Sequence, residues 1–298
     1  MLMLLAACTT AEFPVWFDGI HRVPLRSVQV EGHRLAYLDE GSGTPLILIH
    51  GFGGSMWQWE YQSTALARGF RVITLDLLGS GLSDKPDLEY RPEEVLHFFR
   101  AFMDALQIDR ATLVGNSMGA GVAIGMALTV PERVDRLVLI SGFPAGVKEK
   151  LASPLVRRAL DSSMPAWLVR VGGWFVGSSA TDRVLKEIVY DQSQLTPAVL
   201  NRSGRNRRAT NYIGPVLAIG RTVPIWESEY APRLSQVRQR TLVIWGEEDR
   251  VFPLTVGREL AATLPHAEFV AVPKTGHIPM WEQPEAVNRT ILEFLDRP

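Results

Sequence analysis

Residues 111–121 read ATLVGNSMGAG, an apolar run followed by a glycine-rich turn and a stretch of small residues. The turn fits the pattern G-x-S-x-G. It follows a predicted strand and opens a predicted helix, which is the context that this pattern requires. Side chains at Gly115 and Gly119 would collide with neighbouring backbone in such a sharp turn, and the helix N-terminus favours negative charge beside Ser117. The stretch therefore predicts Ser117 as a nucleophile rather than the idle serine of a glycine-rich turn.

Outward from this turn, apolar runs of strand length alternate with helical patterns. Continuous apolar runs are typical of buried parallel strands, and strand–helix alternation places helices on both faces of the sheet. The predicted fold class is therefore α/β, with a mostly parallel central sheet. The predicted strands are 27–30, 34–38, 45–49, 71–75, 111–114, 136–140, 241–245 and 268–272, and the predicted helices are 57–68, 92–107, 118–130, 254–264 and 282–295.

The alternation stops after Gly142 and resumes at Thr241. The block between them shows helical periodicity, many Trp and Arg residues, and no convincing strand. Its length is that of an inserted helical cap. We therefore expect a core formed by residues 28–142 and 236–298, a cap formed by residues 143–235, and a separate N-terminal segment of residues 1–27.

Composition excludes several classes of protein. The chain has 298 residues, of which 46% are hydrophobic and 21% charged, so it is globular rather than disordered. Its single cysteine excludes a disulfide scaffold, and no histidine pair has metal-ligand spacing. The formal net charge is −1, and no P-loop, dinucleotide fingerprint or nucleic-acid module is found. We expect no metal, no cofactor and no nucleic-acid partner.

A second glycine-rich loop follows the predicted strand 45–49 and reads His50-Gly51-Phe52-Gly53-Gly54. With this loop and the serine turn, the chain resembles the α/β-hydrolase superfamily from about Val28 to Arg297. The resemblance implies that the loop supplies one backbone N–H of an oxyanion hole. The implied donors are the N–H of Phe52 and the N–H of Met118, and His50 is expected to brace the loop.

Two late loops complete the resemblance. Residues 246–253 read GEEDRVFP after the predicted strand 241–245, and they look like the superfamily's acid loop, which selects Asp249 over the neighbouring glutamates. His277 follows the last predicted strand and is the implied base. The chain order Ser117, Asp249, His277 matches the order expected of this fold and differs from both protease orders.

The serine of the G-x-S-x-G turn favours acyl transfer, because epoxide hydrolases and haloalkane dehalogenases of this fold carry Asp at the same position. We therefore expect hydrolysis of a carboxylic ester through an acyl-enzyme on Ser117, probed by turnover of p-nitrophenyl esters. The sequence of this turn, residues 115–119, also resembles that of carbon–carbon bond hydrolases of aromatic catabolism, although the oxyanion loop of those enzymes typically contains Ser or Pro. A lactonase or perhydrolase with the same triad, and a non-catalytic binding protein on the same fold, remain open as further alternatives.

The cap carries two further expectations. Trp167, Trp174 and Phe175 lie in an apolar stretch that could line a pocket for an apolar acyl group. Residues 143–240 hold 15 Lys and Arg against 7 Asp and Glu, so the cap is basic and the remainder acidic. A basic cap is either a solvated face or a surface attracted to anionic lipid headgroups.

The N-terminus reads MLMLLAACTT, in which Leu5-Ala6-Ala7-Cys8 resembles the lipobox of bacterial lipoproteins. The resemblance implies lipidation of Cys8 and a lipid-anchored protein of the bacterial cell envelope. The apolar stretch is short and no Lys or Arg precedes Arg22, so the signal would be a truncated one. The other interpretation is a cytoplasmic protein in which this segment is not a signal.

Overall fold

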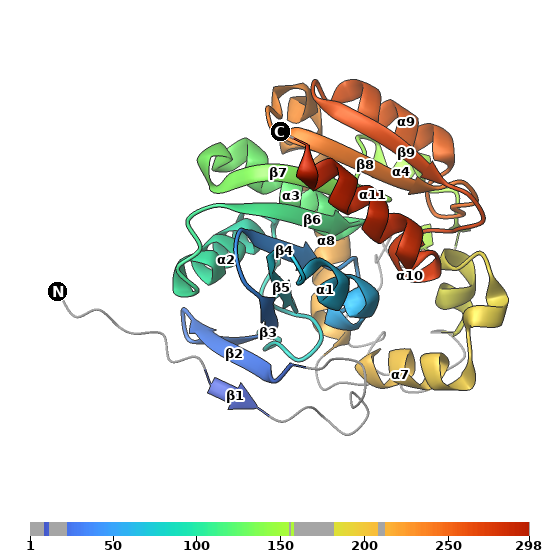
Figure 1. Cartoon of the computed structure of the whole chain (residues 1–298). Helices are drawn as coiled ribbons and strands as arrows, with labels where there is room; N and C mark the ends of the chain where they lie inside the picture. Colours follow the sequence, from blue (N-terminus) through green and yellow to red (C-terminus); the bar gives the residue numbers. More distant parts are fainter. Residues whose placement is uncertain (1–8, 12–22, 155, 158–181, 208–211, 298) are drawn as a thin grey trace.

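The computed structural model describes residues 9–11, 23–154, 156–157, 182–207 and 212–297 (Figure 1). At its centre is a nine-stranded sheet in the order β1-β2-β3-β5-β4-β6-β7-β8-β9. The pairs β1–β2, β2–β3 and β3–β5 are antiparallel. Every later pair in this order, from β5–β4 to β8–β9, is parallel. The predicted α/β class with a mostly parallel sheet is confirmed. The strands are β1 (Thr9–Ala11), β2 (Leu25–Val30), β3 (His33–Gly41), β4 (Pro45–Ile49), β5 (Arg71–Leu75), β6 (Ala111–Asn116), β7 (Val134–Ile140), β8 (Arg240–Gly246) and β9 (Ala267–Val272).

The apolar strands are buried on both faces because neighbouring side chains of a strand point in opposite directions. In β4, Ile47 and Ile49 join one hydrophobic cluster, whereas Leu46 and Leu48 join the other. All four side chains are fully buried. The sheet therefore separates two cores, and each core needs a layer of helices to cover it.

Helices cover both faces of the sheet (Figure 1). Apolar side chains of α2, α3 and α9 belong to the cluster on one face, and those of α1 and α11 belong to the cluster on the other. The chain thus places its helices as the strand–helix alternation predicts. Their bounds are α1 (Glu60–Leu66), α2 (Pro92–Ala105), α3 (Met118–Thr129), α9 (Leu254–Thr263), α10 (Pro279–Glu282) and α11 (Pro284–Asp296), with short 3-10 turns η2 (Met56–Trp59) and η3 (Pro131–Arg133).

The part of residues 143–235 that the structure describes contains helices and turns and no strand. Figure 1 shows the yellow segment that leads to α7 beside α10, at one end of the molecule. This inserted segment therefore stands next to the end of the sheet where β9 leads into α10. Its elements are α4 (Val147–Lys150), a helical stretch at 182–188, η4 (Gln192–Gln194), α7 (Pro197–Arg207), α8 (Ile213–Glu229) and η5 (Ala231–Gln236).

Besides shifts of one to three residues at the ends of elements, the structure differs from the sequence-based elements in three places. The predicted helix 57–68 begins as the 3-10 turn η2 and becomes α-helical only at Glu60. The predicted closing helix 282–295 corresponds to α11, which begins at Pro284, and Glu282 instead ends the separate short helix α10. Strand β1 was not predicted, and it pairs antiparallel with β2 at the edge of the sheet.

Within the described ranges, none of the helices combines the length and the apolar character that a membrane crossing needs.

Candidate active site

Ser117 lies at the turn between β6 and α3, where its backbone has φ 51° and ψ −117°. A non-glycine residue with positive φ is strained by about 1–3 kcal/mol, and such strain is concentrated at functional sites. The flanking glycines allow the turn. A Cβ atom on Gly115 would lie 2.3 Å from backbone atoms of Gly119, and a Cβ atom on Gly119 would lie 2.2 Å from the carbonyl oxygen of Ile49. The packing therefore requires glycine on both sides of Ser117.

Asp249 and His277 form a buried pair on the loops after β8 and β9. His277 Nδ1 lies 2.8 Å from Asp249 Oδ2, and both residues are 6% exposed. The other carboxylate oxygen, Oδ1, accepts hydrogen bonds from the N–H groups of Val251 and Phe252 at 2.8 and 3.0 Å. These two donors fix the carboxylate, so Oδ2 is aimed at the imidazole. The neighbour Glu248 instead accepts from the N–H of Thr275 at 3.1 Å, and Glu247 is exposed.

The serine turn and the histidine loop are joined through Asn116. Its Nδ2 donates to the carbonyl oxygens of Ile140 at 3.2 Å and of His277 at 3.1 Å. The loop after β4 lies against the same turn, because a Cβ atom on Gly51 would be 3.0 Å from Asn116 Oδ1 and 3.3 Å from Ser117 Cβ. The expected nucleophile, acid, base and oxyanion loop therefore gather at the carboxyl ends of parallel strands, where α/β sheets bind ligands.

The two expected oxyanion donors flank this site. Phe52 follows β4, Met118 is the first residue of α3, and both residues are half-buried, as is Ser117. Within the described part of the chain, neither backbone N–H donates to a protein acceptor. Free N–H groups at a helix N-terminus and on a neighbouring loop are suited to stabilise an oxyanion.

Buried polar side chains hold the oxyanion loop in place. His50 Nε2 accepts from the N–H of Leu77 at 3.1 Å, so its proton is on Nδ1, which lies 2.9 Å from the carbonyl oxygen of Gly51. Burial lowers the pKa of His50, which keeps the ring neutral. Gln58 Oε1 accepts from the N–H of Gly51 at 3.1 Å. The structure therefore gives His50 a bracing position, as expected from the sequence.

The inserted segment, which the sequence analysis predicts to be a cap, also contacts this loop. The Tyr212 hydroxyl, at the start of α8, donates to the carbonyl oxygen of Gly53 at 2.9 Å. Gly53 has φ 64° and would bring a Cβ atom to 2.7 Å from that hydroxyl. Sequence reasoning missed Tyr212, Gln58 and Asn116. Only Asn116 carried a signal, as the variable residue of the G-x-S-x-G pattern.

Four residues predicted from the sequence cannot be placed. The pocket candidates Trp167, Trp174 and Phe175, and the lipidation candidate Cys8, lie outside the described residues. An aromatic cluster that the structure does describe within residues 143–235 has other members: Trp226 stacks on Tyr230 and meets Phe143 edge to face. Across the described ranges, no group of three or more His, Cys, Asp or Glu side chains could hold a metal ion.

Comparison with known proteins agrees with this geometry. The family model of the alpha/beta hydrolase fold matches residues 44–284. A 2-hydroxy-6-oxo-6-phenylhexa-2,4-dienoate hydrolase from Burkholderia cepacia is 30% identical over 98% of both chains.

Two solved structures are also similar. One is a meta-cleavage product hydrolase from Pseudomonas fluorescens IP01, with 28% identity and a TM-score of 0.78 over 91% of this chain and 97% of that one. The other is a membrane phospholipase A described as a bacterial virulence factor, with 27% identity and a TM-score of 0.76 over 93% of this chain and 87% of that one. The strained serine turn, the order of the loops along the sheet and these similarities lead to one conclusion: the chain is a hydrolase that belongs to the α/β-hydrolase family.

Proposed function

We propose that this hydrolase cleaves a carbon–carbon bond in 2-hydroxy-6-oxo-dienoates, the compounds that arise when an aromatic ring is opened beside a hydroxyl group. The observation that carries the proposal is the 30% identity over 98% of both chains to a hydrolase named for such a compound. This similarity favours the carbon–carbon alternative over the ester hydrolysis that the sequence analysis put first.

The geometry supports a role for each residue of the site. Ser117 is the nucleophile, His277 accepts its proton, and Asp249 holds the imidazole through the 2.8 Å contact between Oδ2 and Nδ1. The N–H groups of Phe52 and Met118 stabilise the oxyanion that forms when the carbonyl is attacked. One well-placed donor of this kind contributes about 10²–10³ in kcat.

The chemistry of such a substrate explains why a serine triad is sufficient. Moving the proton of the 2-hydroxyl to C5 gives a ketone at C2 conjugated with the C3–C4 double bond. When Ser117 attacks the C6 carbonyl, the C5–C6 bond breaks and its electron pair moves through the conjugated chain to the oxygen at C2. That dienolate takes up the proton that His277 received from Ser117. Water then hydrolyses the acyl-enzyme formed from C6, and a carboxylic acid is released.

Ester hydrolysis is the second candidate, and two observations favour it. The oxyanion loop is His50-Gly51-Phe52-Gly53-Gly54, which lacks the Ser or Pro typical of the carbon–carbon hydrolases. The similarity to a phospholipase A covers 93% of this chain. Both reactions use the same nucleophile and oxyanion hole, so the substrate decides between them.

The two candidates are separated by comparing kcat/KM on 2-hydroxy-6-oxo-6-phenylhexa-2,4-dienoate with kcat/KM on p-nitrophenyl esters of C2 to C16 acids. The loss of the conjugated dienoate substrate is followed by its absorbance, while mass spectrometry identifies the two products. We expect kcat/KM on the dienoate to exceed that on every ester by at least about 10², which corresponds to about 2.7 kcal/mol of additional transition-state stabilisation. A preference for an ester would assign the second function instead.

The lipid anchor at Cys8 stays a proposal that is independent of the catalytic one. It rests on Leu5-Ala6-Ala7-Cys8 and on the basic cap. Fractionation of a bacterial host that expresses the wild type and Cys8→Ala tests it, because only an unaltered Cys8 would bring the protein to the membrane fraction.

A further inference from the structure

A buried carboxyl group lies beside the site and is not part of the triad. Glu282, the last residue of α10, is 4% exposed. Its Oε1 accepts from the N–H of Gly276 at 2.7 Å, and its Oε2 accepts from the N–H of Tyr190 at 2.7 Å and from that of Asp191 at 3.4 Å. One carboxyl group therefore joins the backbone of the histidine loop to the backbone of the cap.

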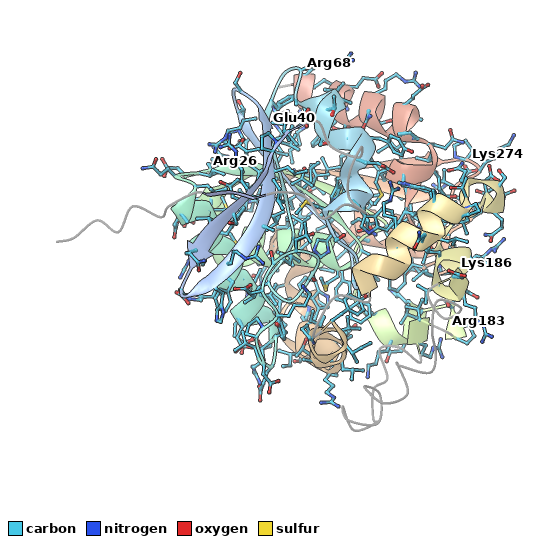
Figure 2. All side chains as sticks on the ribbon, turned by 90° about the horizontal axis from the view of Figure 1, so that it is seen from below. Arg26, Glu40, Arg68, Arg183, Lys186 and Lys274 are labelled. Atoms are coloured by element: carbon cyan, nitrogen blue, oxygen red, sulfur yellow. The ribbon has the colours of Figure 1, made fainter. Side chains whose placement is uncertain are left out.

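The cap also contacts the catalytic histidine directly. The backbone N–H of His277 donates to the carbonyl oxygen of Ile188 at 2.7 Å. Gly276 makes this approach possible, because a Cβ atom there would lie 2.5 Å from that oxygen and 3.1 Å from the N of Tyr190. Figure 2 agrees with these contacts: Lys274 of the histidine loop and Lys186 of the cap project from the same side of the molecule.

We propose that Glu282 is a positioning residue that sets the place of His277 and the place of the cap segment 182–191 together, and that it does so as a carboxylate. The proposal rests on the proposed role of His277 as the base. A carboxylate accepts hydrogen bonds on both oxygens, which is what the N–H groups of Gly276 and Tyr190 require. A protonated carboxyl turns one oxygen into a donor, so one of these N–H groups loses its acceptor.

The surroundings of Glu282 place this change near neutral pH. Burial, with a smaller contribution from the nearby Asp249 carboxylate, raises the pKa of Glu282 to about 7 against the opposing effect of the three backbone N–H groups. The segments that contact Glu282 carry three other titratable residues: His277 on the histidine loop, and Tyr190 and Asp191 on the cap. The Asp191 side chain is itself engaged by Ser193.

A purely structural role makes a different prediction. Replacing Glu282 by Gln keeps the shape and leaves one acceptor and one donor, as in the protonated acid. If Glu282 only stabilises the fold, the Gln variant will lose the same factor in rate at every pH. If the carboxylate positions His277, the loss will be large where wild-type Glu282 is ionised and will disappear where it is protonated.

The experiment measures the rate at which diisopropyl fluorophosphate labels Ser117 between pH 5.5 and 9. Labelling needs the nucleophile, the base and the oxyanion hole but no knowledge of the substrate. We expect Glu282→Gln to be slower by about tenfold or more at pH 8.5, and we expect the two rates to converge within about twofold at pH 5.5. Glu285→Gln, an exposed residue at the start of α11, is the matched control and should follow the wild type throughout.

A second measurement uses the wild type alone, in case the Gln variant does not fold. A single protonation changes the logarithm of the labelling rate with a slope of at most 1, so a slope above 1 between pH 5.5 and 7.5 requires a second ionising group such as Glu282. A slope that nowhere exceeds 1, or a ratio of variant to wild type that is constant with pH, overturns the proposal for Glu282 and leaves the triad unaffected. A wild type that is not labelled overturns the assignment of Ser117, and the proposal for Glu282 fails with it.

Discussion

Replacing Asp249 by Asn tests how the site fixes the proton of His277. In the native site, Oδ1 accepts from two backbone N–H groups and Oδ2 faces His277 Nδ1 at 2.8 Å. An Asn side chain must keep its oxygen toward the two backbone donors, because turning it would bring its NH₂ group against both of them. The NH₂ group therefore faces His277 Nδ1, which must accept, and the imidazole proton moves to Nε2. A ring that carries its proton on Nε2 cannot accept one from Ser117.

The expected loss follows from this tautomer change. An analogous Asp-to-Asn change in a serine protease triad costs about 10⁴ in kcat, or about 5.5 kcal/mol in activation free energy. The assay is kcat on the better of the dienoate and the p-nitrophenyl esters, with urea unfolding as a check on folding. Glu248→Gln is the matched control, because it changes the adjacent carboxyl group, which faces Thr275 instead. A loss below tenfold for Asp249→Asn, or a larger loss for Glu248→Gln, would refute the assignment of the acid.

Four other changes give distinct results. Ser117→Ala should abolish turnover and leave the melting temperature within a few degrees of the wild type, and residual activity above a tenth would contradict its role. Gly119→Ala should unfold at a lower temperature and lose activity, because its Cβ atom would meet the Ile49 carbonyl at 2.2 Å and such overpacking costs about 1–3 kcal/mol or more. Tyr212→Phe removes the hydrogen bond to Gly53 and should cost about 1 kcal/mol of stability and lower kcat more than KM. Folding raises the pKa of Glu282 to about 7. The contribution of Glu282 to the free energy of unfolding is therefore greatest below about pH 4.5 and declines by up to about 3 kcal/mol as the pH rises through 7. Urea unfolding at pH 5 and pH 8 should show a smaller decline in the free energy of unfolding for Glu282→Gln than for the wild type.

Local patterns determined the scaffold of this protein. The strand–glycine–serine–helix order predicts the turn at Ser117 because its steric requirement is met by residues within two positions of the serine. The alternation of apolar runs predicts the sheet because each run must be buried on both faces. The short helix α10 was not predicted, because its four residues are too few to show a helical period.

The order of the three candidate triad residues along the chain was enough to predict that they lie at the same edge of the sheet. Each of Ser117, Asp249 and His277 follows its own parallel strand, and the carboxyl ends of parallel strands meet at one edge of the sheet. The choice of Asp249 over its neighbours came from the resemblance to the family. The structure adds a physical reason, because Val251 and Phe252 donate to Asp249 and aim it at the histidine.

The contacts that hold the site in place are different, because only the tertiary structure decides them. Asn116 reaches a carbonyl 161 residues away, and Tyr212 reaches one 159 residues away. Glu282 meets a cap residue 92 positions earlier in the chain. Each of these contacts joins a side chain to a backbone group of another loop. Backbone groups are the same in nearly every residue, so the sequence does not mark which of them a side chain will contact. The sequence alone therefore determined the candidates for the chemistry, whereas the packing of the inserted segment and the loops decided which residues position them, because that packing brings distant backbone groups within hydrogen-bonding distance.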